Sequence, residues 1–95
     1  MTNYRRGVRA EHRARDLLKQ QGYHTVIRAA GSKGAFDLVG LGSKEIALVQ
    51  VKRRRGISKA ERAELLELKK QLPEFVTVEI WRFFDRARLP EIEIL

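Results

Sequence analysis

The segment from Ile46 to Val51 constrains the fold of this chain most, because it is apolar at every position except Gln50. A strand of this composition is typical of the centre of a sheet that is covered on both faces. A chain of 95 residues has room for one core around such a strand, so we expect a single domain over residues 1–95.

The remaining elements follow from periodicity, glycines and helix caps. A helix is expected over about residues 4–21, because Gly22 suits the left-handed residue that closes a helix. A second helix begins at the capping box of Ser58 and Glu61 and runs to Leu72. Strands are expected over residues 24–29, 36–42, 45–52, 75–84 and 91–95. This order predicts an α/β fold with a mixed central sheet of about five strands flanked by helices.

The basic side chains are concentrated in one part of the chain. The net charge is +8, from 20 Lys and Arg against 12 Asp and Glu. Residues 1–59 contain fourteen basic and four acidic side chains, whereas residues 60–95 contain six and eight. This segregation indicates a surface that binds phosphates, and a solvated basic surface is the alternative.

Cysteine is absent, which excludes disulfides and thiolate metal sites. His12 and His24 stand alone, so a zinc site is not indicated. No segment approaches the roughly 18 consecutive apolar residues of a membrane span. We therefore expect a cytoplasmic protein, of a cell or of a virus in its host, with no membrane association.

Glu11 lies on the apolar side of the first helix. At about 100° per residue its side chain falls between those of Leu18 and Tyr4, so it should point toward the core. A carboxylate in that position must be paired, protonated or bound to a metal. An ion pair with Arg15, one turn further along, is the alternative that involves no function.

Alternation along the central strand puts Gln50 and Lys52 on one face of the sheet. If the preceding hairpin turns at residues 43–44, Asp37 lies close to opposite Gln50, although a slip of one residue would send it to the other face. In this register the three side chains cluster, and the first helix could lay Glu11 over them.

Two carboxylates, one further oxygen ligand and a lysine suit metal-dependent phosphodiester hydrolysis. The ion neutralises the charge that develops on the phosphate and lowers the pKa of a bound water, and the lysine places a positive group near the nucleophile. Mg²⁺ accepts hard oxygen ligands and keeps several exchangeable waters. We therefore predict Mg²⁺ as the cofactor, with Mn²⁺ as a substitute.

At this point the chain resembles the archaeal-type Holliday junction resolvases of the PD-(D/E)XK nuclease superfamily. The resemblance rests on the segments RGVRAE at 6–11, RAAGS at 28–32, FDLV at 36–39 and VQVK at 49–52. It implies a restriction-endonuclease-like fold and a structure-selective DNA endonuclease that resolves four-way junctions. A homodimer is expected, because a junction has near two-fold symmetry.

The resemblance also implies roles for individual residues. Glu11, Asp37 and Gln50 would hold the metal, with the Val51 carbonyl contributing. Lys52 would position the attacking water. Ser32 matches a serine in the mobile loop that such resolvases bring to the scissile phosphate, although a flexible connector is the alternative for this segment. The implied catalytic residues are thus Glu11, Ser32, Asp37 and Lys52.

Gln50 departs from the family pattern, which has Glu or Asp at this position. An amide oxygen can still bind Mg²⁺, but one negative charge is lost and the metal site should be weaker. Three hypotheses therefore stay open: a junction-resolving nuclease, a DNA-binding module that does not cleave, and a nuclease of the same fold acting on flaps, ends or RNA.

Phosphate contacts are expected from basic residues on the outer side of the first helix, in the loop before Asp37, and directly after Lys52. For each group a solvated surface is the alternative. The residues that we assign to DNA binding are Arg5, Arg6, Arg9, Arg13, Lys33, Arg53, Arg54 and Arg55.

Overall fold

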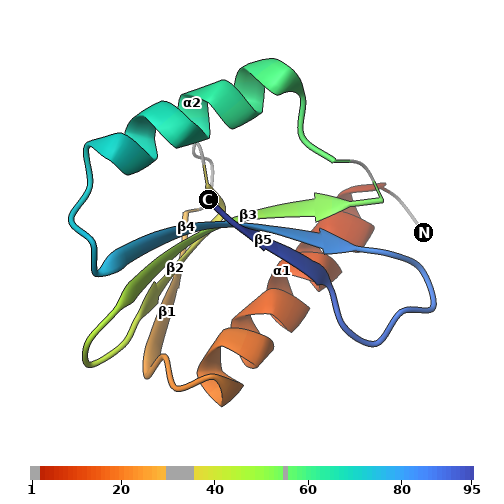
Figure 1. Cartoon of the computed structure of the whole chain (residues 1–95). Coiled ribbons are helices and arrows are strands. Elements are labelled where there is room, and N and C mark those ends of the chain that lie inside the picture. Colours follow the sequence, from red (N-terminus) through yellow and green to blue (C-terminus); the bar gives the residue numbers. More distant parts are fainter. Residues whose placement is uncertain (1–2, 30–35, 55) are drawn as a thin grey trace.

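Five strands form one mixed sheet with a helix on each face, in a computed structural model that describes residues 3–29, 36–54 and 56–95 (Figure 1). The elements are α1 (Asn3–Gln20), β1 (Thr25–Arg28), β2 (Leu38–Leu41), β3 (Ile46–Arg53), α2 (Lys59–Lys70), β4 (Val76–Phe83) and β5 (Glu91–Ile94). Their order is the predicted one, and each boundary lies within two residues of its expected place. Among the described residues, no helix is long and apolar enough to cross a membrane.

The strands follow the order β1-β2-β3-β4-β5, with β3 in the middle. The β3–β4 pair is parallel and the other pairs are antiparallel. In the β2–β3 hairpin, Leu38 pairs with Val49, and the N–H of Gly42 donates to the carbonyl of Glu45 at 2.8 Å. The turn therefore falls at residues 43–44, and the register that places Asp37 next to Gln50 is confirmed.

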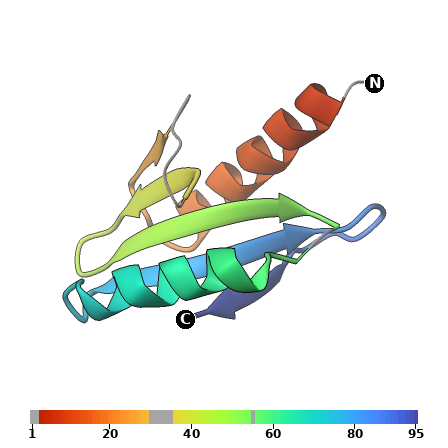
Figure 2. The same cartoon turned by 90° about the horizontal axis from the view of Figure 1, so that it is seen from above.

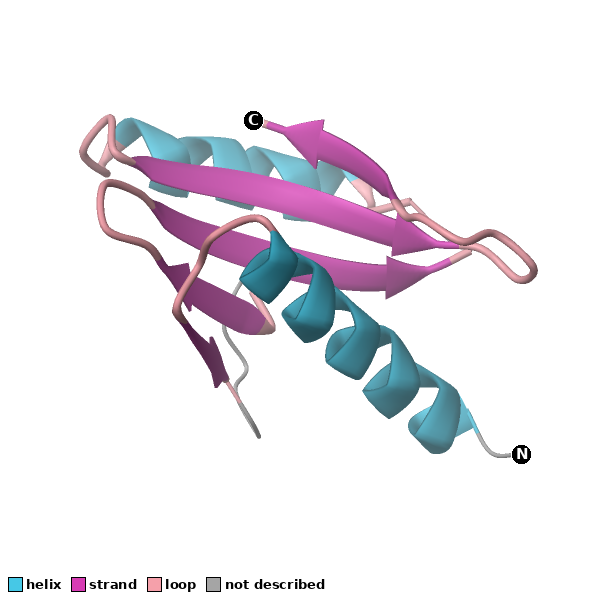
Figure 3. Cartoon of the chain, turned by 90° about the horizontal axis from the view of Figure 1, so that it is seen from below, coloured by secondary structure: helices cyan, strands magenta, loops and turns pink. Residues whose placement is uncertain are grey.

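β3 is covered on both faces, as its composition predicts. Figures 2 and 3 show the two layers: α2 runs alongside β3 and β4, and α1 crosses the other face of the sheet obliquely. The core on the α1 side includes Ala10, Ala14, Leu18, Leu38, Ala47, Val49, Trp81 and Phe83. The core on the α2 side includes Leu48, Leu65, Val76, Val78 and Ile80. The even-numbered residues of β3 thus face α2 and the odd-numbered ones face α1.

One acidic side chain is buried in β4. Glu79 is only 6% exposed, and its carboxylate accepts hydrogen bonds from the Trp81 indole at 3.0 Å and from the Thr77 hydroxyl at 2.7 Å. Both oxygens of Glu79 therefore have hydrogen-bond donors within the sheet, which indicates a structural role.

Burial raises the pKa of the neighbouring Tyr23, and the charges of Glu79 and Glu45 raise it further.

Both helix ends predicted from the sequence are present. Gly22 has a φ of 104°, and its N–H donates to the carbonyl of Lys19 at 3.1 Å beyond the end of α1. Ser58 and Glu61 form the capping box at the start of α2. These local signals determine where α1 ends and where α2 begins.

We expect Gly22→Ala to destabilise the fold by about 1–2 kcal/mol, because a Cβ disfavours the left-handed backbone region. The measurement is the free energy of unfolding in urea. Gly56→Ala is the control, since a Cβ there would meet only the Arg82 guanidinium carbon and nitrogen at 3.7 Å and 3.9 Å, an ordinary contact. Equal losses in the two variants would contradict this explanation.

Candidate active site

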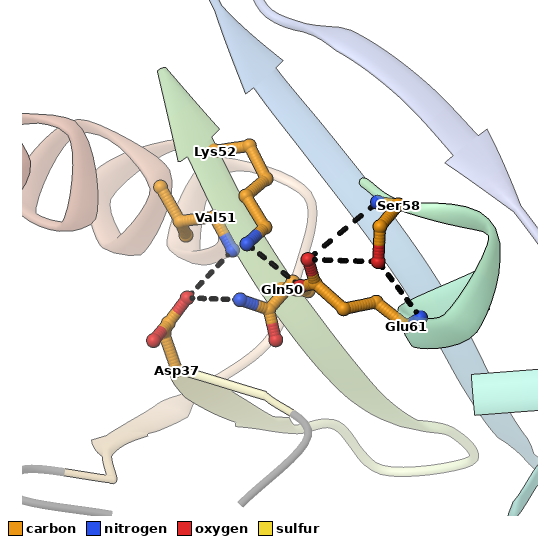
Figure 4. Close-up of polar contacts among 6 residues, drawn as sticks. All are labelled: Asp37, Gln50, Val51, Lys52, Ser58 and Glu61. Atoms are coloured by element: carbon orange, nitrogen blue, oxygen red, sulfur yellow. Dashed lines mark hydrogen bonds and ion pairs between the residues drawn. The ribbon is translucent and has the colours of Figure 1, made fainter. Parts of the chain in front are cut away.

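Asp37 joins the start of β2 to β3. Its backbone N–H donates to the carbonyl of Val49 at 2.8 Å. Its Oδ2 accepts hydrogen bonds from the Val51 N–H at 2.8 Å and from Nε2 of Gln50 at 3.2 Å (Figure 4). These two hydrogen bonds hold the Asp37 carboxylate half-buried against the central strand. We call Asp37, Gln50 and Val51 the fork.

Lys52 extends this cluster on the α2 side of the sheet. Its Nζ donates to Oε2 of Glu61 at 2.8 Å, and its side chain is 25% exposed. The other carboxylate oxygen of Glu61 accepts a hydrogen bond from the Ser58 hydroxyl at 3.3 Å. The hydrogen bond and charge of Lys52, together with smaller contributions from Ser58, lower the pKa of Glu61.

Glu61 was missed as a site residue by sequence reasoning, which identified it only as a helix cap. A signal was nevertheless present, because the capping box places Glu61 in the first turn of the helix that follows Lys52 along the chain. The sequence alone does not show that this turn packs above the end of β3.

Glu11 has a different partner from the one considered for it. Its Oε2 accepts a hydrogen bond from Nε of Arg28, at the end of β1, at 2.9 Å, and its side chain is 19% exposed. The alternative pairing with Arg15 is wrong, since Arg15 lies 3.9 Å from Asp16 instead. α1 packs on the face opposite to Lys52. The described residues therefore bring Asp37, Gln50 and Lys52 together. Glu11 is held by Arg28, whose backbone pairs with Leu38, the neighbour of Asp37.

Some of the predicted residues cannot be placed. Ser32, Lys33 and Arg55 lie outside the described residues, and of Arg5 and Arg6 only the helical backbone is described.

The oxygen atoms of the fork suit Mg²⁺ in type and supply little charge. A carboxylate, an amide and a backbone carbonyl are hard oxygen ligands, which Mg²⁺ accepts. The Gln50 amide presents Nε2 to Asp37, and a half-turn of the amide would present Oε1 instead. Within the described residues, no three side chains among His, Cys, Asp and Glu come together to hold a metal ion. Asp37 thus provides the only charge of the fork.

A hollow of about 490 Å³ lies at the carboxyl end of β3 and β4, on the side of α1. We call it the basic groove; its lining is Arg9, Ala10, Arg13, Arg53, Phe83, Phe84, Asp85 and Arg86. The Arg13 guanidinium lies 5.3 Å from the centre of the Phe83 ring, and Asp85 pairs with both Arg53 and Arg54. Arginine thus dominates the charge of the groove.

A second hollow, of about 500 Å³, lies on the α2 side of the same end of β3. It is lined by Lys52, Arg53, Gly56, Ile57, Ser58 and Glu61. Because Arg53 lines both hollows, the two hollows lie next to each other at the end of β3.

Comparisons with known proteins indicate the family and the fold of this chain. A sequence model of the family described as archaeal Holliday junction resolvase (hjc) matches residues 2–79. A UPF0102 protein of Magnetococcus marinus is 30% identical over 82 residues, which are 85% of this chain and 66% of that protein. The structure of Archaeoglobus fulgidus Hjc, a Holliday junction resolvase from an archaeal hyperthermophile, matches with a TM-score of 0.67 and 20% identity, over 95% of this chain and 71% of that chain. The match to that structure confirms the predicted PD-(D/E)XK fold.

The Lys52–Glu61 pair should make stability depend on pH. Because the pKa of Glu61 is lowered below its ordinary value of 4.5, its ionised form stabilises the folded state. This stabilisation is complete above that ordinary value and is lost as the pH falls through the lowered one. Wild type should therefore exceed Glu61→Gln in unfolding free energy at neutral pH, and the difference should shrink below pH 4.5.

Urea unfolding at a series of pH values measures this difference. Glu64→Gln, an exposed position of the same helix, controls for the loss of a helical charge. A difference that is unchanged from neutral to acid pH would argue against the ion pair.

Proposed function

The chain belongs to the archaeal Holliday junction resolvase family, and from this we propose that it is a structure-selective DNA endonuclease that resolves four-way junctions by metal-dependent phosphodiester hydrolysis. The observation that carries the proposal is the fork with Lys52 beside it: Asp37 is fixed on β3 by Val51 and Gln50, and Lys52 lies on the same face.

Three residues of the fork would hold the metal: Asp37 through its carboxylate, Gln50 through its amide oxygen and Val51 through its carbonyl. Glu11 completes this set by family likeness, although its carboxylate is engaged by Arg28 in this arrangement. A bound Mg²⁺ or Mn²⁺ would neutralise phosphate charge and lower the pKa of a water.

Two further residues would act on the reacting groups. The ammonium of Lys52 would orient the attacking water and place a positive charge near it. Ser32, which lies outside the described residues, is proposed by family likeness to contact the scissile phosphate.

The basic groove supports DNA as the substrate. Arginine side chains bind the phosphate backbone without reading its sequence, which suits an enzyme that recognises the shape of a junction. The groove and the hollow at Lys52 share Arg53, so one strand could reach the fork while neighbouring phosphates contact the groove. Each chain carries one fork, and a homodimer would place two forks on opposing strands of a junction.

A second candidate is a DNA-binding module that does not cleave. Gln50 favours it, because the amide leaves Asp37 as the only charged group of the fork. This candidate predicts salt-sensitive binding of junctions without hydrolysis. A panel of flaps, ends and RNA separates both candidates from a nuclease of the same fold with another substrate.

We expect Asp37→Asn to reduce junction cleavage on the order of 10²–10³-fold, because it removes the metal-binding charge. The asparagine oxygen can still accept the hydrogen bond of Val51, so the fold should be kept. The assay compares a synthetic junction with linear duplex in Mg²⁺ and in Mn²⁺, and Asp16→Asn on the exposed side of α1 is the control. If wild type in excess cuts no DNA with either metal, the nuclease proposal fails and the binding module remains.

We expect Arg9→Gln to weaken binding to junction and duplex alike and to lower the slope of log affinity against log salt by about one, since one phosphate contact is lost. Fluorescence anisotropy over a salt series, in the Asp37→Asn background, measures this slope. Lys70→Gln is the control, because Lys70 lies at the end of α2 far from the groove and pairs with Glu67. An unchanged slope would exclude Arg9 from the DNA contact.

A further inference from the structure

The proposed metal site is short of one negative charge. In the family pattern an acid at position 50 and Asp37 together outweigh the positive Lys52, giving a formal charge of −1. With Gln50 the same three side chains sum to zero, and the charge of Glu11, the remaining proposed ligand, is offset by its ion pair with Arg28. A neutral cluster attracts a divalent cation weakly, because Mg²⁺ and Mn²⁺ favour anionic oxygen ligands.

Glu61 brings a carboxylate to this cluster from α2. Its Oε2 lies 2.8 Å from Nζ of Lys52, and Figure 4 shows the side chain reaching from the helix toward Lys52 and Gln50. With Glu61 included, the formal charge of the cluster returns to −1. The charge missing from β3 is therefore present on the neighbouring element.

The Glu61 carboxylate is fixed in place. The backbone N–H of Glu61 donates to the Ser58 hydroxyl at 3.1 Å, and the Glu61 carboxylate accepts a hydrogen bond from the same hydroxyl. Its position in the first turn of α2 favours a negative charge, because the helix dipole is positive there. The lowered pKa of Glu61 agrees with an ionised side chain.

We propose that Glu61 supplies, from α2, the negative charge that Gln50 lacks at the metal site of the fork. It acts as a positioning residue, which holds Lys52 and raises the affinity of the fork for a divalent cation. This inference rests on the proposed function, since it assumes that the fork binds a metal ion.

The test moves the charge back to position 50. Mn²⁺ binding to the full chain without DNA is measured by calorimetry for wild type, Glu61→Gln, Gln50→Glu and the double variant Gln50→Glu/Glu61→Gln. Glu61→Gln should lower the affinity for Mn²⁺ about 10-fold or more, as loss of a group supporting a metal site commonly does. The double variant should recover most of this loss, because its cluster again has a formal charge of −1.

Two controls separate the loss of the Glu61 charge from a loss of structure. Glutamine can replace glutamate in a capping box, so Glu61→Gln keeps the helix start, and circular dichroism checks this. Glu64→Gln on the same helix should bind Mn²⁺ as wild type does. A purely structural role for Glu61 predicts a loss that Gln50→Glu cannot rescue.

Three results would overturn the inference: an unchanged Mn²⁺ affinity in Glu61→Gln, a loss without rescue in the double variant, or no Mn²⁺ binding by any of the four proteins. Junction cleavage is assayed separately on the same proteins. If Mn²⁺ affinity follows the charge and none of the proteins cleaves, the nuclease proposal fails while the role of Glu61 stands. If wild type cleaves and Glu61→Gln binds Mn²⁺ as tightly as wild type does, only the inference fails.

Discussion

The hydrogen bond from the Val51 N–H to Asp37 is the contact on which the rest of the site depends. The β2–β3 ladder ends at the Leu38–Val49 pair, so beyond it the edge of β3 that faces β2 has no strand partner, although β3 stays paired with β4 as far as Arg53. A buried N–H without a partner is costly, and the Asp37 carboxylate satisfies that of Val51 at 2.8 Å. β2 and β3 can therefore separate at this point without leaving the Val51 N–H unpaired. The side chains at the end of β3 then lie beside the fixed Asp37 carboxylate.

Alternation along β3 then distributes its side chains between the two faces of the sheet. Gln50 and Lys52 face α2, Val51 packs toward α1, and Arg53 lines hollows on both sides. The proposed chemistry and the proposed phosphate binding are thus adjacent because they use neighbouring residues of one strand. Glu11, on α1, pairs with Arg28 at the end of the edge strand β1.

Local signals predicted the fold well, and contacts between distant elements were harder to foresee. Gly22, the Ser58–Glu61 capping box and the turn at residues 43–44 each act over a few residues, and all three are present. The turn also determined the register, which is why the contact between Asp37 and Gln50 could be predicted. A helical wheel shows which side of α1 is apolar but not which face of the sheet it covers. For that reason the position of Glu11 and the Lys52–Glu61 pair did not follow from periodicity.

Gln50 has a physical role in the fork in the absence of a metal ion. Two carboxylates about 3 Å apart repel each other unless a proton or a cation lies between them. At position 50 the amide instead donates to Asp37, so the fork is satisfied without an ion. The cost is a weaker attraction for a cation, and the carboxylate that offsets this cost is that of Glu61, held on α2 by Lys52 and Ser58. An amide in the strand and an acid on the helix together give a site that is stable when empty and still carries net negative charge.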